Sequence, residues 1–366
     1  MDAATGAQKW AYDVDGDILW SVVDENVIYI FLHASYSYDS DVCAVNASDG
    51  ALLWRWNAGY YVFLSEPTIS DGEMYFGSYG GSPGANDFYA LDTADGMVRW
   101  NVTVAAMAGG ISTVADGVVY TDSGSLGQSL VALDAQNGSE LWTYPIGYFA
   151  RSSPTVVGGI VYVDGREGTL INPNSLNSQL VLGVSNVYAL NASNGNRIWN
   201  FSGNDKDYRT ISFVGDIAFF CSNDTLYALN AKKGLQLWSL STGESGTGIC
   251  VVNGDALYYY SGSTLYDLDS ANGMSYWNYT NNEESFLAVE GGVAFFYAGN
   301  SVYGLGLPGS PSASSNASMS PNPTPSPSVP ELQSNFLIIL IVASIAAVFC
   351  SKCFKQASIT EGHRKT

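Results

Sequence analysis

The chain has 366 residues, and its 34 acidic residues outnumber its 14 basic ones, which gives a formal net charge of −20. Such a charge repels phosphate backbones and anionic lipids, so it argues against nucleic acid as a partner. The only histidines are His33 and His363, and Cys43, Cys221 and Cys250 fall in different repeats, so neither a metal cluster nor a disulfide framework is expected.

The chain opens with a short unit, Gly6 followed four residues later by Trp10, that recurs as far as residue 277. The seven tryptophans are Trp10, Trp54, Trp100, Trp142, Trp199, Trp238 and Trp277, and the glycines before them are Gly6, Gly50, Gly96, Gly138, Gly195, Gly234 and Gly273. Most of these tryptophans are about 40 residues apart, a period typical of the blades of a β-propeller.

Each repeat is predicted to form four short strands. In the copy that ends at Trp199 we expect strands at residues 153–157, 160–163, 186–190 and 197–200, because these stretches are rich in β-branched and aromatic residues. Gly158-Gly159 and Asn194-Gly195 supply the positive φ angles that tight hairpins need. The fold class is therefore all-β, a propeller with four-stranded blades.

The two ends of the repeat region complement each other. The last repeat stops at Leu305 without a Gly or Trp, whereas Asp2 to Trp10 is a fourth strand with no predecessor. We expect this N-terminal strand to pair with the last three strands and to close a ring of seven blades, which leaves no open sheet edge. The alternative is eight blades with the first part missing.

The unit Ala-Leu-Asn-x-x-x-Gly-x-x-x-Trp at 189–199 resembles the tryptophan-docking repeat of pyrroloquinoline-quinone (PQQ) type β-propellers, found in quinoprotein alcohol dehydrogenases and in a bacterial outer-membrane assembly lipoprotein. The resemblance covers residues 2–305. It implies that each Trp packs between the Ala and the Gly peptide of neighbouring motifs. The Asp or Asn after Ala-Leu would cap the turn; these residues are Asn46, Asp92, Asp134, Asn191, Asn230 and Asp269.

The same resemblance bears on catalysis. Quinoprotein catalysis uses a vicinal cysteine pair over the quinone and a calcium ion held by carboxylate and Asn, and this sequence has no adjacent cysteines and no matching acid. Asp13, Asp15 and Asp17 suggest calcium, but Gly16 stands at the wrong position for an EF-hand. We expect no catalytic residue, no cofactor and no metal; the alternative is a PQQ- and calcium-dependent oxidoreductase.

The candidate ligand-binding residues are Trp20, Tyr148, Arg151, Tyr208 and Arg209. In a four-stranded meander the tight Gly turns share one edge, so the long segments, including the insertion 164–185, share the other, where functional loops concentrate. The two arginines beside tyrosines suit a carboxylate or sugar acid, and the alternative is that each arginine pairs with a neighbouring acid. A protein or a glycan is the expected partner.

The region after residue 307 differs in composition. We divide the chain into the propeller (1–307), a Ser/Pro-rich stalk (308–334), a transmembrane helix (335–351) and a basic cytosolic tail (352–366). Basic residues follow the helix, so the propeller should lie outside the cell. Val329 to Leu332 and the basic end also resemble the C-terminal sorting tails of archaeal surface proteins.

An outward propeller agrees with the glycosylation sequons, which occur at Asn46, Asn101, Asn137, Asn191, Asn200, Asn223, Asn278 and Asn316. The sequence has no N-terminal leader, so we expect the true start to lie upstream. Together these features predict a membrane-anchored, non-catalytic binding propeller at the cell surface; the alternatives are a quinoprotein oxidoreductase and an envelope-assembly scaffold.

Overall fold

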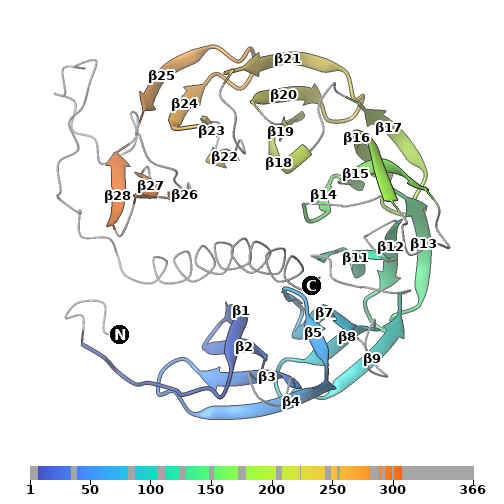
Figure 1. The fold of residues 1–366 in the computed structure, drawn as a ribbon, viewed down its shortest axis with the longest axis vertical. Helices are drawn as coiled ribbons and strands as arrows, with labels where there is room; N and C mark the ends of the chain where they lie inside the picture. The colour runs from blue at the N-terminus through green and yellow to red at the C-terminus, as the bar shows by residue number, and fades with distance from the viewer. Residues whose placement is uncertain are drawn as a thin grey trace, which may run out of the picture. The chain divides into compact units, whose positions relative to one another are not determined.

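The computed structural model describes the chain over the following residues: 7–33, 39–80, 87–104, 112–123, 129–147, 152–171, 179–202, 208–222, 224–243, 249–253, 256–280, 288–290, 293–298 and 301–306. These residues form antiparallel strands in seven sheets, and the strands of each sheet follow one another in the sequence (Figure 1). The chain forms two compact units: one holds β1 to β11, the other holds β14 to β28, and the sheet of β10 to β13 contributes to both.

The strands of the first unit and of the shared sheet have the following bounds. The first sheet contains β1 (Asp17–Asp24), β2 (Val27–His33), β3 (Asp39–Asn46) and β4 (Leu52–Tyr60). The second contains β5 (Val62–Leu64), β6 (Thr68–Ser70), β7 (Glu73–Gly80), β8 (Asp87–Asp92) and β9 (Val98–Thr103). The shared sheet contains β10 (Thr113–Ala115), β11 (Val118–Ser123), β12 (Ser129–Asp134) and β13 (Glu140–Pro145).

The second unit holds four sheets. Their strands are β14 (Thr155–Val157), β15 (Ile160–Ile171), β16 (Gln179–Asn191), β17 (Arg197–Phe201), β18 (Tyr208–Val214), β19 (Ile217–Ser222), β20 (Thr225–Asn230), β21 (Gln236–Ser241), β22 (Ile249–Asn253), β23 (Ala256–Ser261), β24 (Thr264–Leu268), β25 (Ser275–Thr280), β26 (Ala288–Glu290), β27 (Val293–Ala298) and β28 (Ser301–Gly306). The predicted all-β class is confirmed for the described residues.

The position of a strand in its sheet decides which of its residues are buried. The second and third strands are covered on both faces, so β8 is an almost continuous buried run from Asp87 to Leu91. The fourth strand has one exposed face: in β9, Trp100 is buried while Arg99 and Asn101 are exposed. This difference explains why the second and third strands contain mostly Val, Leu, Ala, Tyr and Phe.

The turn before each fourth strand is built around its glycine. Gly96 has a φ of +72°, and its N–H donates to the carbonyl of Asp92 at 2.9 Å. The Asp92 carboxylate accepts a second hydrogen bond, from the N–H of Ala94 at 2.7 Å. The equivalent Asp or Asn makes this contact in four other described turns, at Asn46, Asp134, Asn191 and Asp269. In the remaining turn, Asn230 accepts from the N–H one residue later, that of Lys233.

In the described structure, six of the seven repeat tryptophans lie on the glycine of the next repeat. The Trp54 indole covers Gly96 so closely that a Cβ there would lie 2.5 Å from the ring, and its Nε1–H donates to the carbonyl of Thr93 at 2.9 Å. The same pair of contacts joins Trp10 to Gly50, Trp100 to Gly138, Trp142 to Gly195, Trp199 to Gly234 and Trp238 to Gly273. Consecutive repeats are therefore joined by one recurring contact.

The N-terminal residues behave as the end of a preceding repeat. Trp10 lies on Gly50 of the first sheet, as the tryptophan of a fourth strand does on the repeat that follows it. Within the described residues, however, 7–16 form no strand, and the sheet of β26 to β28 has three strands. Gly6 lies outside the described residues, so closure of a seven-bladed ring remains a prediction.

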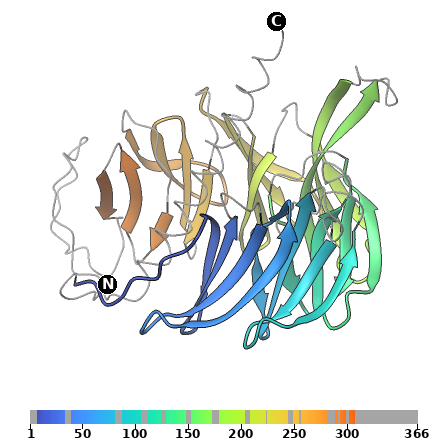
Figure 2. The same cartoon turned by 60° about the horizontal axis from the view of Figure 1, so that its bottom comes forward.

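The insertion at 164–185 differs from the expected loop. The pairing of β15 with β16 continues past the sheet, through Gly168 opposite Leu182 to Ile171 opposite Gln179. Figure 2 shows this ribbon, in green, projecting beyond the other strands of its sheet. The stretch continues as strand because both of its sides are rich in Leu, Val, Ile and Thr, which favour extended backbone.

Residues 307–366, which include the predicted stalk, transmembrane helix and tail, lie outside the described residues. Within the part of the chain that the structure describes, no helix is long and apolar enough to cross a membrane.

Replacing Gly96 with Ala tests the tryptophan contact, with Gly117 as the matched control. Both glycines have nearly equal positive φ values, +72° and +74°, but a Cβ at Gly117 would meet nothing within 4 Å. We expect Gly117→Ala to lower the free energy of unfolding by about 1 kcal/mol through backbone strain alone. Gly96→Ala should cost about 2 kcal/mol more, because the Trp54 ring must move.

Urea denaturation of the two variants measures this difference. Equal losses for Gly96→Ala and Gly117→Ala would show that the indole contact adds no constraint beyond the backbone angle.

Candidate functional site

The five predicted ligand-binding residues are only partly described. Tyr148 and Arg151 lie outside the described residues, and Tyr208 and Arg209 are described only as backbone positions of β18. Trp20 lies on β1, where its indole N–H donates to the carbonyl of Leu64 at 3.2 Å and its ring packs against the core cluster. These contacts give Trp20 a structural role, and the ligand site predicted around the two arginines stays a prediction.

A stack of three aromatic rings lies at the edge of the sheets opposite the Gly turns, which we call the long-connection edge. His33 ends β2, Phe63 lies on β5, and Tyr79 lies near the end of β7. The His33 and Phe63 rings are stacked with centroids 4.5 Å apart, and the Phe63 and Tyr79 rings are stacked at 5.2 Å with their planes 17° apart. We refer to these three residues as the aromatic stack.

Backbone contacts fix the aromatic stack. Phe63 and Tyr79 are directly opposite each other in the pairing of β5 with β7. Buried Ser40 donates its hydroxyl to the Val62 carbonyl and lies 3.2 Å from His33 Nδ1, so one serine connects His33 to the residue that precedes Phe63. The ring positions are set by these strands and not by a free loop.

Two carboxylates lie beside the stack. Asp17 is opposite His33 in the pairing of β1 with β2, and Asp39 begins β3. Burial lowers the pKa of the His33 imidazole, and the negative charges of Asp17 and Asp39 offset part of that effect. A lowered pKa leaves His33 uncharged at neutral pH, so the edge presents aromatic rings and negative charge.

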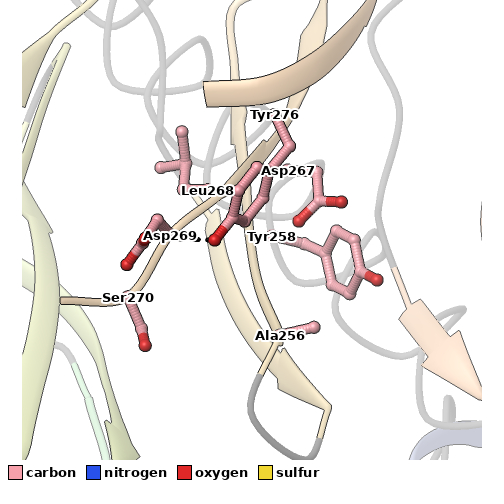
Figure 3. Close-up of a pocket in the computed structure, with 7 residues that line it drawn as sticks. All are labelled: Ala256, Tyr258, Asp267, Leu268, Asp269, Ser270 and Tyr276. Atoms are coloured by element: carbon pink, nitrogen blue, oxygen red, sulfur yellow. Dashed lines mark hydrogen bonds between the residues drawn. The ribbon is translucent and has the colours of Figure 1, made fainter. Parts of the chain in front are cut away.

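A pocket of about 500 Å³ lies on the sheet of β22 to β25, in the second unit. Its lining consists of Ala256, Tyr258, Asp267, Leu268, Asp269, Ser270 and Tyr276 (Figure 3). Tyr276 crosses the mouth and donates its hydroxyl to the Asp269 carboxylate at 3.0 Å. The pocket therefore presents hydroxyls and two carboxyl groups between tyrosine rings.

Asp267 departs from the repeat. It lies opposite Trp277, at a position where Ala44, Ala90, Ala189 and Ala228 lie opposite their own tryptophans. Burial raises the pKa of the Asp267 carboxyl, and the nearby Trp277 indole offsets only part of that rise. Trp277 Nε1 is itself buried and makes no hydrogen bond of normal geometry with another described residue.

The described cysteines and acids do not assemble a reactive centre. Cys43, Cys221 and Cys250 are buried free thiols, and burial raises the pKa of Cys250 to about 12, so it stays protonated. Among the residues that the structure describes, no three His, Cys, Asp or Glu side chains gather closely enough to hold a metal ion.

The sequence did not single out Phe63, Tyr79 or Asp267. Phe63 and Tyr79 carry no motif, and only the β5 to β7 pairing brings them together. Asp267 had a usable signal, because it is an acid at an alanine position of the repeat.

The glycosylation candidates in the described region also have structural contacts. Asn46, Asn137 and Asn191 accept turn N–H bonds, and Asn101 and Asn200 donate across to neighbouring polar side chains. Asn278 is exposed on β25, whereas Asn223 and Asn316 lie outside the described residues.

A comparison with protein families gives a match along the repeat region. The family described as outer membrane protein assembly factor BamB matches residues 1–108, 84–181 and 183–306. Among curated proteins, the serine/threonine-protein kinase AfsK of Streptomyces griseus is 29% identical over 137 residues. This match covers 34% of the chain and 16% of the kinase, so the chain spans a small part of that relative.

Solved structures share the fold. BamB from Moraxella catarrhalis matches with a TM-score of 0.57 and 16% identity, over 79% of this chain and 85% of that one. A europium-containing methanol dehydrogenase has a TM-score of 0.58 and 12% identity, over 78% of this chain and 76% of that one. Quinohemoprotein alcohol dehydrogenase ADHIIG from Pseudomonas putida HK5 has a TM-score of 0.53 and 13% identity, over 81% of this chain and 65% of that one.

Replacing Asp267 with Ala, the residue of the other repeats, tests the cost of its buried carboxyl. Because the folded-state pKa is raised, the carboxyl costs no stability below the unfolded pKa and destabilises the fold as the pH rises through the folded pKa. We expect Asp267→Ala to raise the melting temperature at pH 7 and to lose that advantage near pH 3.

Asp269→Ala is the matched control, with the opposite sign. Hydrogen bonds from the Ala271 N–H and the Tyr276 hydroxyl lower the pKa of Asp269, so its contribution is present at neutral pH and is lost as the pH falls. Its replacement should lower the melting temperature at pH 7 and matter less near pH 3. If the effects of the two substitutions on the melting temperature changed with pH in the same direction, this account of the pocket would be wrong.

Proposed function

We propose a binding function for this chain, which belongs to the family described as outer membrane protein assembly factor BamB. In this proposal the propeller is non-catalytic and holds a protein or glycan at the long-connection edge of its sheets. The structural relatives include both an assembly factor and quinone-dependent dehydrogenases, but their identities to this chain are 12–16%, which carries over the fold alone.

The supporting observation is the ribbon formed by β15 and β16. β14 pairs with β15 only from Ile160 to Tyr162, and β17 pairs with β16 only from Leu190 back to Val187. From Gly168 to Ile171, β15 pairs with β16 alone, whereas Gly165 and Arg166 lie against the backbone of Ile146 and Gly147. A ribbon with two outer edges that no described strand covers is the kind of surface to which a partner can add a strand.

Assembly is the specific form of binding that the family match favours. The family description names an outer membrane protein assembly factor, BamB, and the Moraxella catarrhalis structure is that of a BamB. A propeller suits such a role because its rigid sheets can hold the segments that bind a partner at one edge. Binding of this kind needs no catalytic residue. For this chain, we propose a scaffold that holds another envelope or surface protein.

Membrane attachment is part of the same proposal. It rests on the apolar run 336–349, on the basic residues that follow it and on the Pro-rich segment before it. This arrangement would hold the propeller outside the cell at the end of a stalk, with the tail in the cytosol.

Photocrosslinking from the ribbon tests the binding function. A photoreactive phenylalanine analogue replaces Leu170 or Leu180, which are opposite each other in the ribbon, in the full-length chain within its native membrane. Matched control sites are Asp95 and Asn194, in the tight turns. We expect both ribbon sites to crosslink to one protein that the turn sites do not capture; the same products from all four sites, or none, would contradict the proposal.

Titration with PQQ and calcium separates binding from catalysis. We expect no rise in the melting temperature of the full-length chain and no reduction of a dye with alcohol or sugar substrates, because no vicinal cysteines exist to contact the quinone. A saturable rise in melting temperature together with turnover would instead support the quinoprotein oxidoreductase.

A further inference from the structure

The repeat that ends at Trp277 has an unusual row of side chains across its sheet. In three other sheets the residues directly opposite one another on neighbouring strands are a Tyr, an Ala and a Trp: Tyr29, Ala44 and Trp54; Tyr75, Ala90 and Trp100; and Tyr162, Ala189 and Trp199. In the sheet of β22 to β25 the row is Tyr258, Asp267 and Trp277. A carboxyl group therefore replaces the alanine methyl group between two aromatic side chains.

The two aromatic members of this row are hydrogen-bond donors. Tyr162 and Trp199 both donate to the Ala231 carbonyl, at 3.1 and 2.8 Å. In the described part of the chain, the Tyr258 hydroxyl and the Trp277 indole N–H have no such partner, although Tyr258 is only 4% exposed and the indole nitrogen is buried. Their rings lie together, with centroids 6.4 Å apart. A ligand that brings an oxygen atom would satisfy a donor here.

The pocket beside this row carries negative charge without a matching cation. Asp267 and Asp269 both line it, and no described Lys or Arg forms an ion pair with either. Burial raises the pKa of the Asp267 carboxyl, so its charge costs the fold stability at a position where other repeats have alanine. An uncompensated charge in a pocket favours a ligand of opposite charge.

The hydrogen bonds already made at the pocket decide which cation fits. The Asp269 carboxylate accepts from the Ala271 N–H at 2.8 Å and from the Asn272 amide at 3.1 Å. It also accepts from the Tyr276 hydroxyl at 3.0 Å, so its lone pairs are largely occupied while its charge remains. The rings of Tyr258 and Tyr276 line the same pocket (Figure 3). A quaternary ammonium group needs no hydrogen-bond acceptor and packs on aromatic rings, so it suits this pocket better than a primary ammonium.

We propose that the pocket lined by Tyr258, Asp267, Asp269 and Tyr276 binds a small quaternary ammonium compound that carries an oxygen atom close to its cation. The methyl groups of the cation pack against the tyrosine rings beside the two carboxylates, and the oxygen accepts from the Tyr258 hydroxyl. The volume of about 500 Å³ is in the range of small-molecule sites. This site is separate from the ribbon that carries the proposed binding function.

Isothermal titration calorimetry with the full-length chain in a maltoside detergent tests the inference. The probe is choline, which has a quaternary ammonium group and a hydroxyl. It is compared with 3,3-dimethyl-1-butanol, which has the same shape without the charge, and with tetramethylammonium, which has the charge without the oxygen. We expect choline to bind most tightly, tetramethylammonium more weakly and the neutral alcohol not at all.

Three variants locate the binding. Asp267→Asn should weaken choline about tenfold, because it removes a partly buried charge and keeps the shape of the side chain. Tyr276→Leu should weaken it about threefold through loss of a ring. Asp134→Asn is the matched control: it removes one negative charge from a turn position that Asn46 and Asn191 occupy in other repeats, so it should leave the affinity unchanged.

Several outcomes would overturn the inference. Equal binding of choline and the neutral alcohol would show an apolar cavity without a cation site. Equal losses in Asp267→Asn and Asp134→Asn would reduce the binding to general attraction by the acidic surface, and an absence of saturable heat with choline would leave no site at all. Crosslinking from Leu170 and Leu180 does not involve this pocket, so the proposed binding function and this inference can fail separately.

Discussion

The contact of each tryptophan with the glycine of the next repeat is the constraint on which the structure depends. The indole needs a flat neighbour, and only a residue without a Cβ leaves room beneath the ring: at Gly138 a Cβ would lie 2.5 Å from Trp100. The glycine can adopt its positive φ because the preceding Asp or Asn holds the turn. In two repeats a tyrosine adds to the contact, since Tyr29 and Trp54 both donate to the Thr93 carbonyl, and Tyr162 and Trp199 both donate to that of Ala231.

This constraint applies to one edge of each sheet only. The Gly turns cannot change length without separating an indole from its carbonyl partner, so they repeat with little variation. Among the described residues, no recurring Trp–Gly contact is found at the opposite edge, and the connections there differ in length. There the chain adds β5, which completes the aromatic stack, and extends β15 and β16 into a ribbon. The recurring contact and the variable connections thus lie at opposite edges of the same sheets.

The strands that recur in every repeat could be predicted from the sequence, whereas the pairings that occur only once could not. The second and third strands could be found because each copy shows the same buried pattern, as in Val187–Leu190. Pairing within the insertion 164–185 was missed because a short apolar stretch does not reveal its partner. Phe63 and Tyr79 are 16 positions apart and meet only through strand pairing. The packing of Trp20 against the core cluster could not be predicted either, because burial depends on neighbours that one strand does not specify; its role as a ligand residue stays a prediction.

Departures from the repeat are therefore the positions where a function of this particular chain can be sought. The repeat that ends at Trp277 keeps its Gly273, but it has an acid, Asp267, where the five repeats before it have alanine. It is also the repeat whose indole N–H finds no partner among the described residues. The following motif reads Gly304-Leu305-Gly306 and lacks the capping Asp or Asn that forms the receiving turn elsewhere. An acid opposite the tryptophan and a following motif without the capping Asp or Asn occur together here, which distinguishes this repeat from the other described ones.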